Sequence, residues 1–358
     1  MKDAPEKKRL IYADVLRVIA TMLVILNHLP SEDLHGFHSG IPAVLDMLLS
    51  FIIITDVPVF FMLSGMLLLD KEESFTDLLK KRIARIAVVL IVVFAGMYFT
   101  NALVSVKHGG GADISAWGFI KAFLACGLDG AEFYWFLYAY LSLLFMLPFL
   151  RPAAKHIGRA EFIMLIVLRV IFSSAIPIFN AFSVSAFNDT LGVTDKLSFP
   201  MAVFDAFFFA VCGYYLDKKV DAAALKLKHF ILLYALCIAA MIVSCVLPDK
   251  EPQWQLFSYV YVFTFFLTVK KLTAGSFKDR GTAVSKSTTV FAFFAPLCFG
   301  IYLLDPFFKR AFYAKYSAVF EPYHTNILFS LGWLVLSFTL GALITWMLKR
   351  IPGVRKYL

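Results

Sequence analysis

The chain is poor in charged residues. Only 16% of its 358 residues are Asp, Glu, Lys or Arg, whereas soluble domains usually carry about 25%. Hydrophobic residues make up 60% of the chain, and the mean hydropathy is +0.78. The apolar residues also gather in blocks that are too long for the core helices of a soluble domain. An ordinary water-soluble domain is therefore excluded, and the composition predicts an all-α polytopic membrane protein.

Cysteine is also scarce. The five cysteines are scattered and lack metal-ligand spacing, so we expect neither a metal site nor a disulfide framework: Cys126, Cys212, Cys237, Cys245 and Cys298. No internal repeat or low-complexity tract is visible, and we expect neither a cleavable signal peptide nor a soluble domain at either end. We therefore expect residues 1–358 to form a single membrane domain.

The long apolar runs predict about ten transmembrane helices, because roughly 20 residues cross a bilayer as a helix. The predicted spans are 11–30, 43–69, 83–106, 133–150, 161–179, 199–216, 229–247, 254–270, 288–308 and 325–348.

The net charge of +9 is distributed asymmetrically. Of the 34 Lys and Arg residues, 25 lie in the termini and in the alternate connections on one side of the predicted spans, and only seven lie on the other side. This is the positive-inside pattern, so both termini should be cytoplasmic. The basic clusters are then explained by topology and by contact with anionic lipids. Nucleic acid is not an expected partner.

The first span carries two ionisable residues, Arg17 and His28. They are eleven residues apart, which places them within about 20° of each other around a helix and about 16 Å apart along it. Ionisable groups are costly in lipid and usually line a polar cavity. Two structural alternatives exist: Asp14, one turn earlier, can pair with Arg17, and His28 can be a hydrogen-bonded interface residue. Its place on the same face as Arg17 favours a general base.

Further candidate site residues lie in the second and third spans. Asp56 is a carboxylate at a depth similar to that of His28 and is a candidate to orient its imidazole. It precedes Pro58, which should kink the span. In the next span, Arg82 and Arg85 share a helix face and, with Arg17, form a candidate binding site for phosphate groups. The alternative for Arg82 and Arg85 is plain positive-inside anchoring.

Two pairs in later spans are more ambiguous. Trp135 and Tyr138 share a face near the outer end of the fourth span, where an aromatic belt and a sugar-stacking surface look alike. Arg169 and Asp205 are buried charges that either pair with each other or line a cavity.

Five segments, taken in order, resemble the integral membrane acyltransferase-3 family. They are the Arg17-x10-His28 pair, VPVFFMLSGMLLL in the second span, KKRIARI opening the third, YWFLYAYLSLLFMLPFLRP in the fourth and FGIYLLDPFF in the ninth, which together cover about residues 9–310. The ten-span form without a further domain is similar to bacterial envelope O-acetyltransferases.

The resemblance implies an acyl donor, usually acetyl-CoA, and a hydroxyl acceptor on an envelope carbohydrate or related molecule. It implies catalytic roles for Arg17 and His28, and donor binding by Arg82 and Arg85. One position departs from the family, because Asp305 stands where family members often have histidine. If Asp305 helps to bind the acceptor, we expect it to do so by accepting a hydrogen bond from a hydroxyl group.

The sequence thus predicts a membrane-bound acyltransferase of the bacterial cytoplasmic membrane, which we expect to be an O-acetyltransferase. Acetyl-CoA would bind Arg17, Arg82 and Arg85, and His28 would act as general base or form an acyl-imidazole, oriented by Asp56. Trp135, Tyr138 and Asp305 are the expected acceptor-binding residues. The alternatives are a secondary transporter, which would show paired repeats with broken helices, and a non-catalytic sensing or uptake module.

Overall fold

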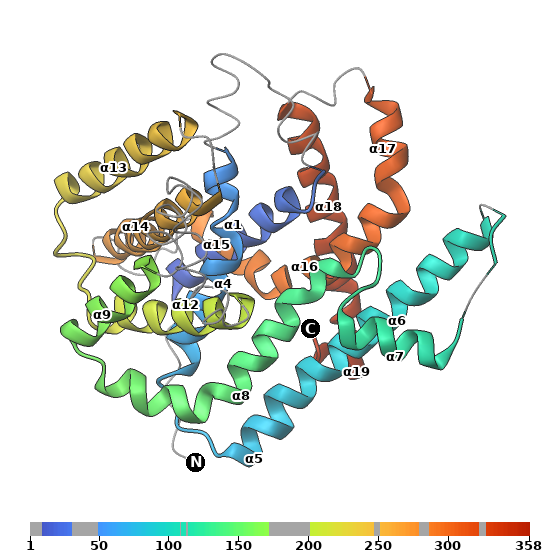
Figure 1. Cartoon of the computed structure of the whole chain (residues 1–358), viewed down its shortest axis with the longest axis horizontal. Helices are drawn as coiled ribbons and strands as arrows, with labels where there is room; N and C mark the ends of the chain where they lie inside the picture. Colours follow the sequence, from blue (N-terminus) through green and yellow to red (C-terminus); the bar gives the residue numbers. More distant parts are fainter. Residues whose placement is uncertain are drawn as a thin grey trace, which may run out of the picture.

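A computed structural model describes residues 9–30, 49–107, 109–111, 114–171, 201–246, 251–278, 286–321 and 327–358. Within these ranges, the backbone alone is described for residues 201–204, 240–246, 251–259, 274–278 and 286–288. Within these ranges every regular element is a helix. In Figure 1, α13 and α14 lie at one end of the molecule and α6 and α7 at the opposite end, with α1 and α4 between them.

Helices lie in the described part of each predicted span. Their bounds are α1 Ile11–Asn27, α4 Asp56–Leu68, α5 Phe75–Leu78, the π-helix η1 Leu79–Ile83, α6 Ala84–Lys107, α7 Ala116–Ala125, the 3-10 helix η2 Glu132–Tyr134, α8 Trp135–His156, α9 Arg159–Val170, α12 Met201–Lys218, α13 Leu227–Val246, α14 Glu251–Lys278, α15 Lys286–Phe294, the 3-10 helix η4 Ala295–Leu297, α16 Cys298–Phe308, the π-helix η5 Lys309–Tyr313, α17 Ala314–Val319, α18 Ile327–Leu348 and α19 Pro352–Arg355.

In the described part of the chain, five helical segments are long and apolar enough to cross a membrane. They are Leu49–Leu68, Phe75–Lys107, Glu132–His156, Thr289–Val319 and Ile327–Leu348. The all-helical membrane fold is therefore supported, while the count of ten spans and the cytoplasmic termini stay predictions. The second half of the predicted span 161–179 lies outside the described residues. Helix α7 was not predicted as an element.

The predicted kink at Pro58 is confirmed. A turn at residues 54–55 interrupts the helix, and α4 begins at Asp56, two residues before the proline. Proline has no N–H to donate to the carbonyl one turn earlier, so an unbroken helix would lose that bond there. The break leaves Asp56 in the first turn of α4, buried at 3% exposure.

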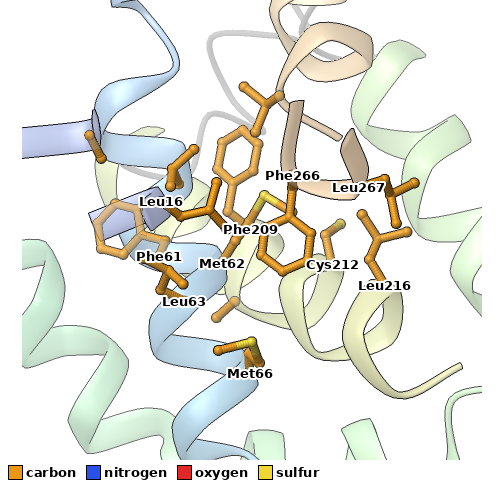
Figure 2. Packing of buried hydrophobic residues seen from close by; sticks show 14 of the residues in the cluster. Leu16, Phe61, Met62, Leu63, Met66, Phe209, Cys212, Leu216, Phe266 and Leu267 are labelled. Carbon is orange, nitrogen blue, oxygen red and sulfur yellow. The ribbon is translucent and has the colours of Figure 1, made fainter. Parts of the chain in front are cut away.

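Helices α4 and α12 approach each other backbone to backbone, as the small pair Ser64-Gly65 suggests. A Cβ atom on Gly65 would lie 1.8 Å from the backbone oxygen of Ala210, and one on Gly213 would lie 2.2 Å from that of Met62. Figure 2 shows the apolar cluster around this contact, in which α4, α12 and α14 pack against one another. This contact fixes the position of α4 and thus of the site residues on it.

We expect Gly65→Ala to destabilise the protein, because the added methyl group meets backbone atoms that cannot move aside alone. Overpacking of this kind costs roughly 1–3 kcal/mol, and it should lower the thermal unfolding midpoint measured in detergent. Gly353→Ala is the matched control, since no atom lies within 4 Å of the new methyl group. Equal midpoints for the two variants would contradict the close α4–α12 packing.

The pair Arg169 and Asp205 turns out to be structural. The guanidinium group on α9 donates a hydrogen bond to the carboxylate on α12, and the Arg169 side chain is 3% exposed. The arginine also lies over the ring of Phe208. Of the two interpretations that the sequence leaves open, the structure favours pairing between helices over a cavity lining.

Candidate active site

A cavity of about 580 Å³ lies among α1, α4, η1, α6, η2, α8 and α16. Six of the eight predicted site residues line it: Arg17, His28, Asp56, Arg82, Arg85 and Trp135. Arg17 on α1 and His28, which caps the end of α1, thus line the same cavity, as expected of two residues on one helix face. A cavity that reaches from one to the other extends about 16 Å along the helix.

Two groups of side-chain contacts define the two ends of this cavity. At one end the Asn27 amide donates to the Asp56 carboxylate at 2.9 Å, and the ring of Phe133 lies 4.1 Å from that of His28. At the other end the side chains of Arg82 and Arg151 both bind Glu73, in the connection that follows α4. We refer to the first as the His28 end, lined by Asn27, His28, Asp56, Glu132, Phe133 and Trp135. The second is the basic end, lined by Arg17, Lys71, Arg82 and Arg85.

His28 is held by a carboxylate that lies 277 residues further along the chain. Nδ1 of His28 lies 2.6 Å from Oδ2 of Asp305 on α16, and both side chains are buried. The hydroxyl of Ser337 on α18 donates to the other oxygen, Oδ1, at 2.5 Å. A carboxylate on Nδ1 keeps a proton on that nitrogen, which leaves Nε2 of a neutral imidazole as the acceptor. This is the arrangement that a general base needs.

This contact corrects two predictions. Asp56 is not the group that orients His28, because its oxygens accept hydrogen bonds from the Asn27 side chain and from the Val57 N–H instead. Asp305 is fully buried, binds His28 and Ser337, and does not line the cavity where an acceptor was expected to meet it. Asp305 thus holds the position beside His28 that the sequence suggested for Asp56, while Asp56 lines the cavity.

Two tyrosines fasten the segment that carries Phe133 to α16. The Tyr134 hydroxyl donates to the Leu303 carbonyl at 2.9 Å, and the Tyr302 hydroxyl donates to the Phe133 carbonyl at 2.9 Å. Since α16 also carries Asp305, these bonds hold the phenyl ring and the carboxylate in a fixed relation to His28. The imidazole is thereby enclosed between an aromatic ring and an acid.

At the basic end, Arg17 shares the Asp14 carboxylate with Arg9. The Nη1 atom of Arg17 lies 3.4 Å from Asp14, whereas Nε of Arg9 lies 2.5 Å from it. The predicted pairing with Asp14 thus exists, but the shorter contact belongs to Arg9. The Arg17 side chain keeps 29% of its surface exposed and lines the cavity, so its guanidinium group is available to a ligand.

Arg82 and Arg85 line the same end but bind protein groups. Arg82 Nε contacts both oxygens of Glu73, at 2.8 and 3.0 Å. Arg85 donates through Nε and Nη2 to the Tyr357 carbonyl, at 3.2 and 3.1 Å. A π-helical turn, η1, contains Arg82, and such turns are frequent at functional sites. A ligand that binds these guanidinium groups has to share them with Glu73 and the C-terminal segment.

Glu73 lies outside the candidate membrane spans and binds two arginines, Arg82 and Arg151. Burial opposes ionisation of its carboxyl, but the hydrogen bonds and charges of Arg151 and Arg82 outweigh that effect and lower the pKa of Glu73. A lowered pKa in the folded state means that the interaction contributes its full stability above the unfolded-state pKa of about 4.3. The contribution is lost as the pH falls through the lower, folded-state value.

We therefore expect Glu73→Gln to lower the unfolding temperature at pH 7 and to matter progressively less as the pH falls below about 4. The measurement is thermal unfolding of both proteins in detergent across this pH range. Glu72→Gln is the matched control, because the Glu72 side chain is 88% exposed and contacts only Lys155 in a surface ion pair. A stability loss at pH 7 that is equal for both variants would contradict the Glu73 network.

Of the predicted aromatic pair on α8, Trp135 and Tyr138, only Trp135 lines the cavity. Trp135 lines the cavity at its His28 end and is 40% exposed. The hydroxyl of Tyr138 instead donates to the Phe123 carbonyl on α7 at 2.6 Å, and the ring does not line the cavity. The structure therefore leaves Trp135 as an acceptor-binding candidate and gives Tyr138 a contact between helices.

Several lining residues were missed by sequence reasoning. Between the two ends, Ser64 and Tyr140 supply hydroxyl groups among apolar and aromatic side chains that include Phe60, Phe136 and Phe299. Tyr140 follows Phe136 by one helical turn and so shares its face, which is a signal that periodicity alone provides. Asn27, Glu132 and Lys71 carry no comparable signal, since polar residues at the ends of spans are common.

Comparison with known proteins identifies the family to which the chain belongs. No curated protein and no solved structure matches the chain significantly. The sequence model of a membrane acyltransferase family, described as an acyltransferase domain, matches residues 10–348. This match covers nearly the whole chain and contains every residue that lines the cavity. The chain belongs to the acyltransferase-3 family.

Proposed function

We propose that this membrane acyltransferase transfers an acetyl group from cytoplasmic acetyl-CoA to a hydroxyl group of an envelope carbohydrate or related acceptor, with His28 as general base. The observation that carries the proposal is the single cavity that joins three arginines at one end to the His28–Asp305 pair at the other. One extended donor needs both: basic side chains for its phosphates and, some distance away, a base beside its reacting carbonyl. The location in a bacterial cytoplasmic membrane belongs to the same proposal.

The donor would lie along the cavity with its phosphates at the basic end. Arginine suits this role because its planar guanidinium group binds phosphate oxygens in pairs. The pantetheine arm would then lie in the middle of the cavity, which is lined by aromatic and apolar side chains and by the hydroxyl groups of Ser64 and Tyr140. The thioester would reach His28 about 16 Å further along α1.

At the His28 end the acceptor hydroxyl would attack the thioester carbonyl. Nε2 of His28 takes the hydroxyl proton as the new C–O bond forms, and Asp305 on Nδ1 stabilises the resulting imidazolium. Collapse of the tetrahedral intermediate breaks the C–S bond, and the imidazolium returns its proton to the departing CoA thiolate. The products are the O-acetylated acceptor, free CoA and neutral His28, so proton and charge balance without another reactant.

The direct test is transfer of labelled acetyl groups from acetyl-CoA by the purified protein in detergent, with envelope fractions as acceptor. We expect Arg17→Lys to raise the KM for acetyl-CoA about tenfold, because a point charge cannot replace charge-assisted bonds from a planar fork. Arg9→Lys is the control, since Arg9 binds Asp14 and the Ala292 carbonyl outside the cavity. Uptake of a solute without dependence on CoA would instead favour a transporter.

A further inference from the structure

The His28 end of the cavity has an exposed rim above buried reactive groups. Asn27, Glu132 and Trp135 line the cavity and are all exposed, whereas His28 and Asp56 are buried at 8% and 3% exposure. A molecule that enters here passes the rim before its hydroxyl group reaches the imidazole. The rim is therefore placed to select the acceptor.

The two ends of the cavity carry opposite charges. Arginine and lysine side chains line the basic end, whereas the acidic groups that the described lining places at the His28 end are the carboxyl groups of Asp56 and Glu132. Two basic residues lie nearby but outside the lining. The Lys309 ammonium binds the His28 carbonyl and lies over the Phe133 ring, and Arg310 pairs with Asp129 at 3.0 Å.

Resting on the proposed acyl transfer, we propose that Glu132 determines acceptor specificity by excluding acceptors with a negative charge near the reacting hydroxyl. The acceptor class is then a neutral or amino sugar whose ring stacks on Trp135, not a uronate or a phosphorylated sugar. Like charges that are brought together at a partly desolvated site repel strongly and suppress the wrong partner. Trp135 offers an apolar ring face without any charge requirement.

The separation of charges along the cavity would affect the donor and the acceptor differently. An anionic donor is drawn to the basic end and repelled from the His28 end, so its phosphates do not occupy the acceptor position. An anionic acceptor would be attracted past His28 toward the arginines, where it would compete with the donor. A carboxylate on the rim opposes that entry, and this single effect favours both correct donor placement and a non-anionic acceptor.

The test compares an oligogalacturonide with its methyl ester. The two carry the same hydroxyl groups and differ at the carboxyl groups, which are charged in the first and neutral methyl esters in the second. Purified protein receives labelled acetyl-CoA, and transfer to each oligosaccharide is measured together with CoA release. We expect the wild type to prefer the methyl ester at least about tenfold in kcat/KM, and Glu132→Lys to reduce that preference about tenfold or more. Asp129→Lys is the matched control, because it makes the same charge change three residues away, outside the cavity lining.

Equal acceptor preferences in the Glu132→Lys and Asp129→Lys variants would overturn the proposal, and so would a wild-type preference for the uronate. Labelling of neither oligosaccharide while His28-dependent CoA release continues would also count against it. Loss of all CoA release from the wild type would overturn the proposed transferase function instead. A preference that only the Glu132 variant changes would establish this carboxylate as the specificity determinant.

Discussion

Replacing His28 with alanine is expected to reduce acetyl transfer by about 10²–10⁴-fold, the usual contribution of a positioned general base. The expectation follows from the geometry at Nδ1, where a buried carboxylate holds the ring and leaves Nε2 to face the chemistry. The loss should appear in kcat, because His28 lies about 16 Å from the Arg17 position that we assign to donor binding. The measurement is labelled-acetyl transfer by purified protein, with the amount of folded protein matched.

A histidine elsewhere in the chain provides the control for this substitution. His156, the last residue of α8, is exposed and contacts only the Pro152 carbonyl one turn earlier, so His156→Ala should retain the wild-type rate. Folding of the His28→Ala protein can be checked by its thermal unfolding midpoint. Wild-type transfer by folded His28→Ala protein would remove the general base from the proposal.

Helical periodicity predicts the part of the site that lies within one helix. Arg17 lies on α1 and His28 directly follows the last residue of that helix, and a period of 3.6 residues is enough to place both on one face. The same reasoning places Arg82 and Arg85 together at the start of the next long helix. These predictions rest on local geometry, and the cavity lining agrees with all four residues.

Contacts between helices that are distant in sequence are not predictable in this way. Asp56 and Asp305 are both carboxylates at suitable depth, and sequence spacing cannot tell which one reaches His28. The packing of α16 against α1 decides in favour of Asp305. The hydroxyl groups of Tyr134 and Tyr302 hold α16 to the segment that carries Phe133.

Partners of the arginines were missed for a related reason. Glu73 lies in a short connection, where an acidic residue usually faces solvent, yet it receives hydrogen bonds from Arg82 and Arg151. The Tyr357 carbonyl on Arg85 comes from the C-terminal segment, which carries no sequence pattern for such a contact. Both contacts suggest that donor binding competes with internal partners at the basic end.

Asp305→Asn is expected to reduce kcat by about 10²-fold or more while leaving the KM for acetyl-CoA unchanged. Asparagine preserves the shape of the side chain but removes the charge that stabilises the imidazolium. Its amide can also donate to Nδ1, which favours the tautomer with the proton on Nε2, where the ring cannot act as a base. The separation of kcat from KM distinguishes this positioning role from general damage to the cavity, which would change both.

Ser337→Ala tests the same assignment from the other side of the carboxylate. It removes the hydrogen bond to Oδ1 of Asp305 but leaves Oδ2 on His28, so we expect less than a tenfold loss of kcat. The order of effects, with Asp305→Asn far above Ser337→Ala, is what a carboxylate acting through the imidazole requires. Equal losses in both variants would mean that the carboxylate acts by supporting the packing of α16 against α18, and His28 would then need another group to set its tautomer.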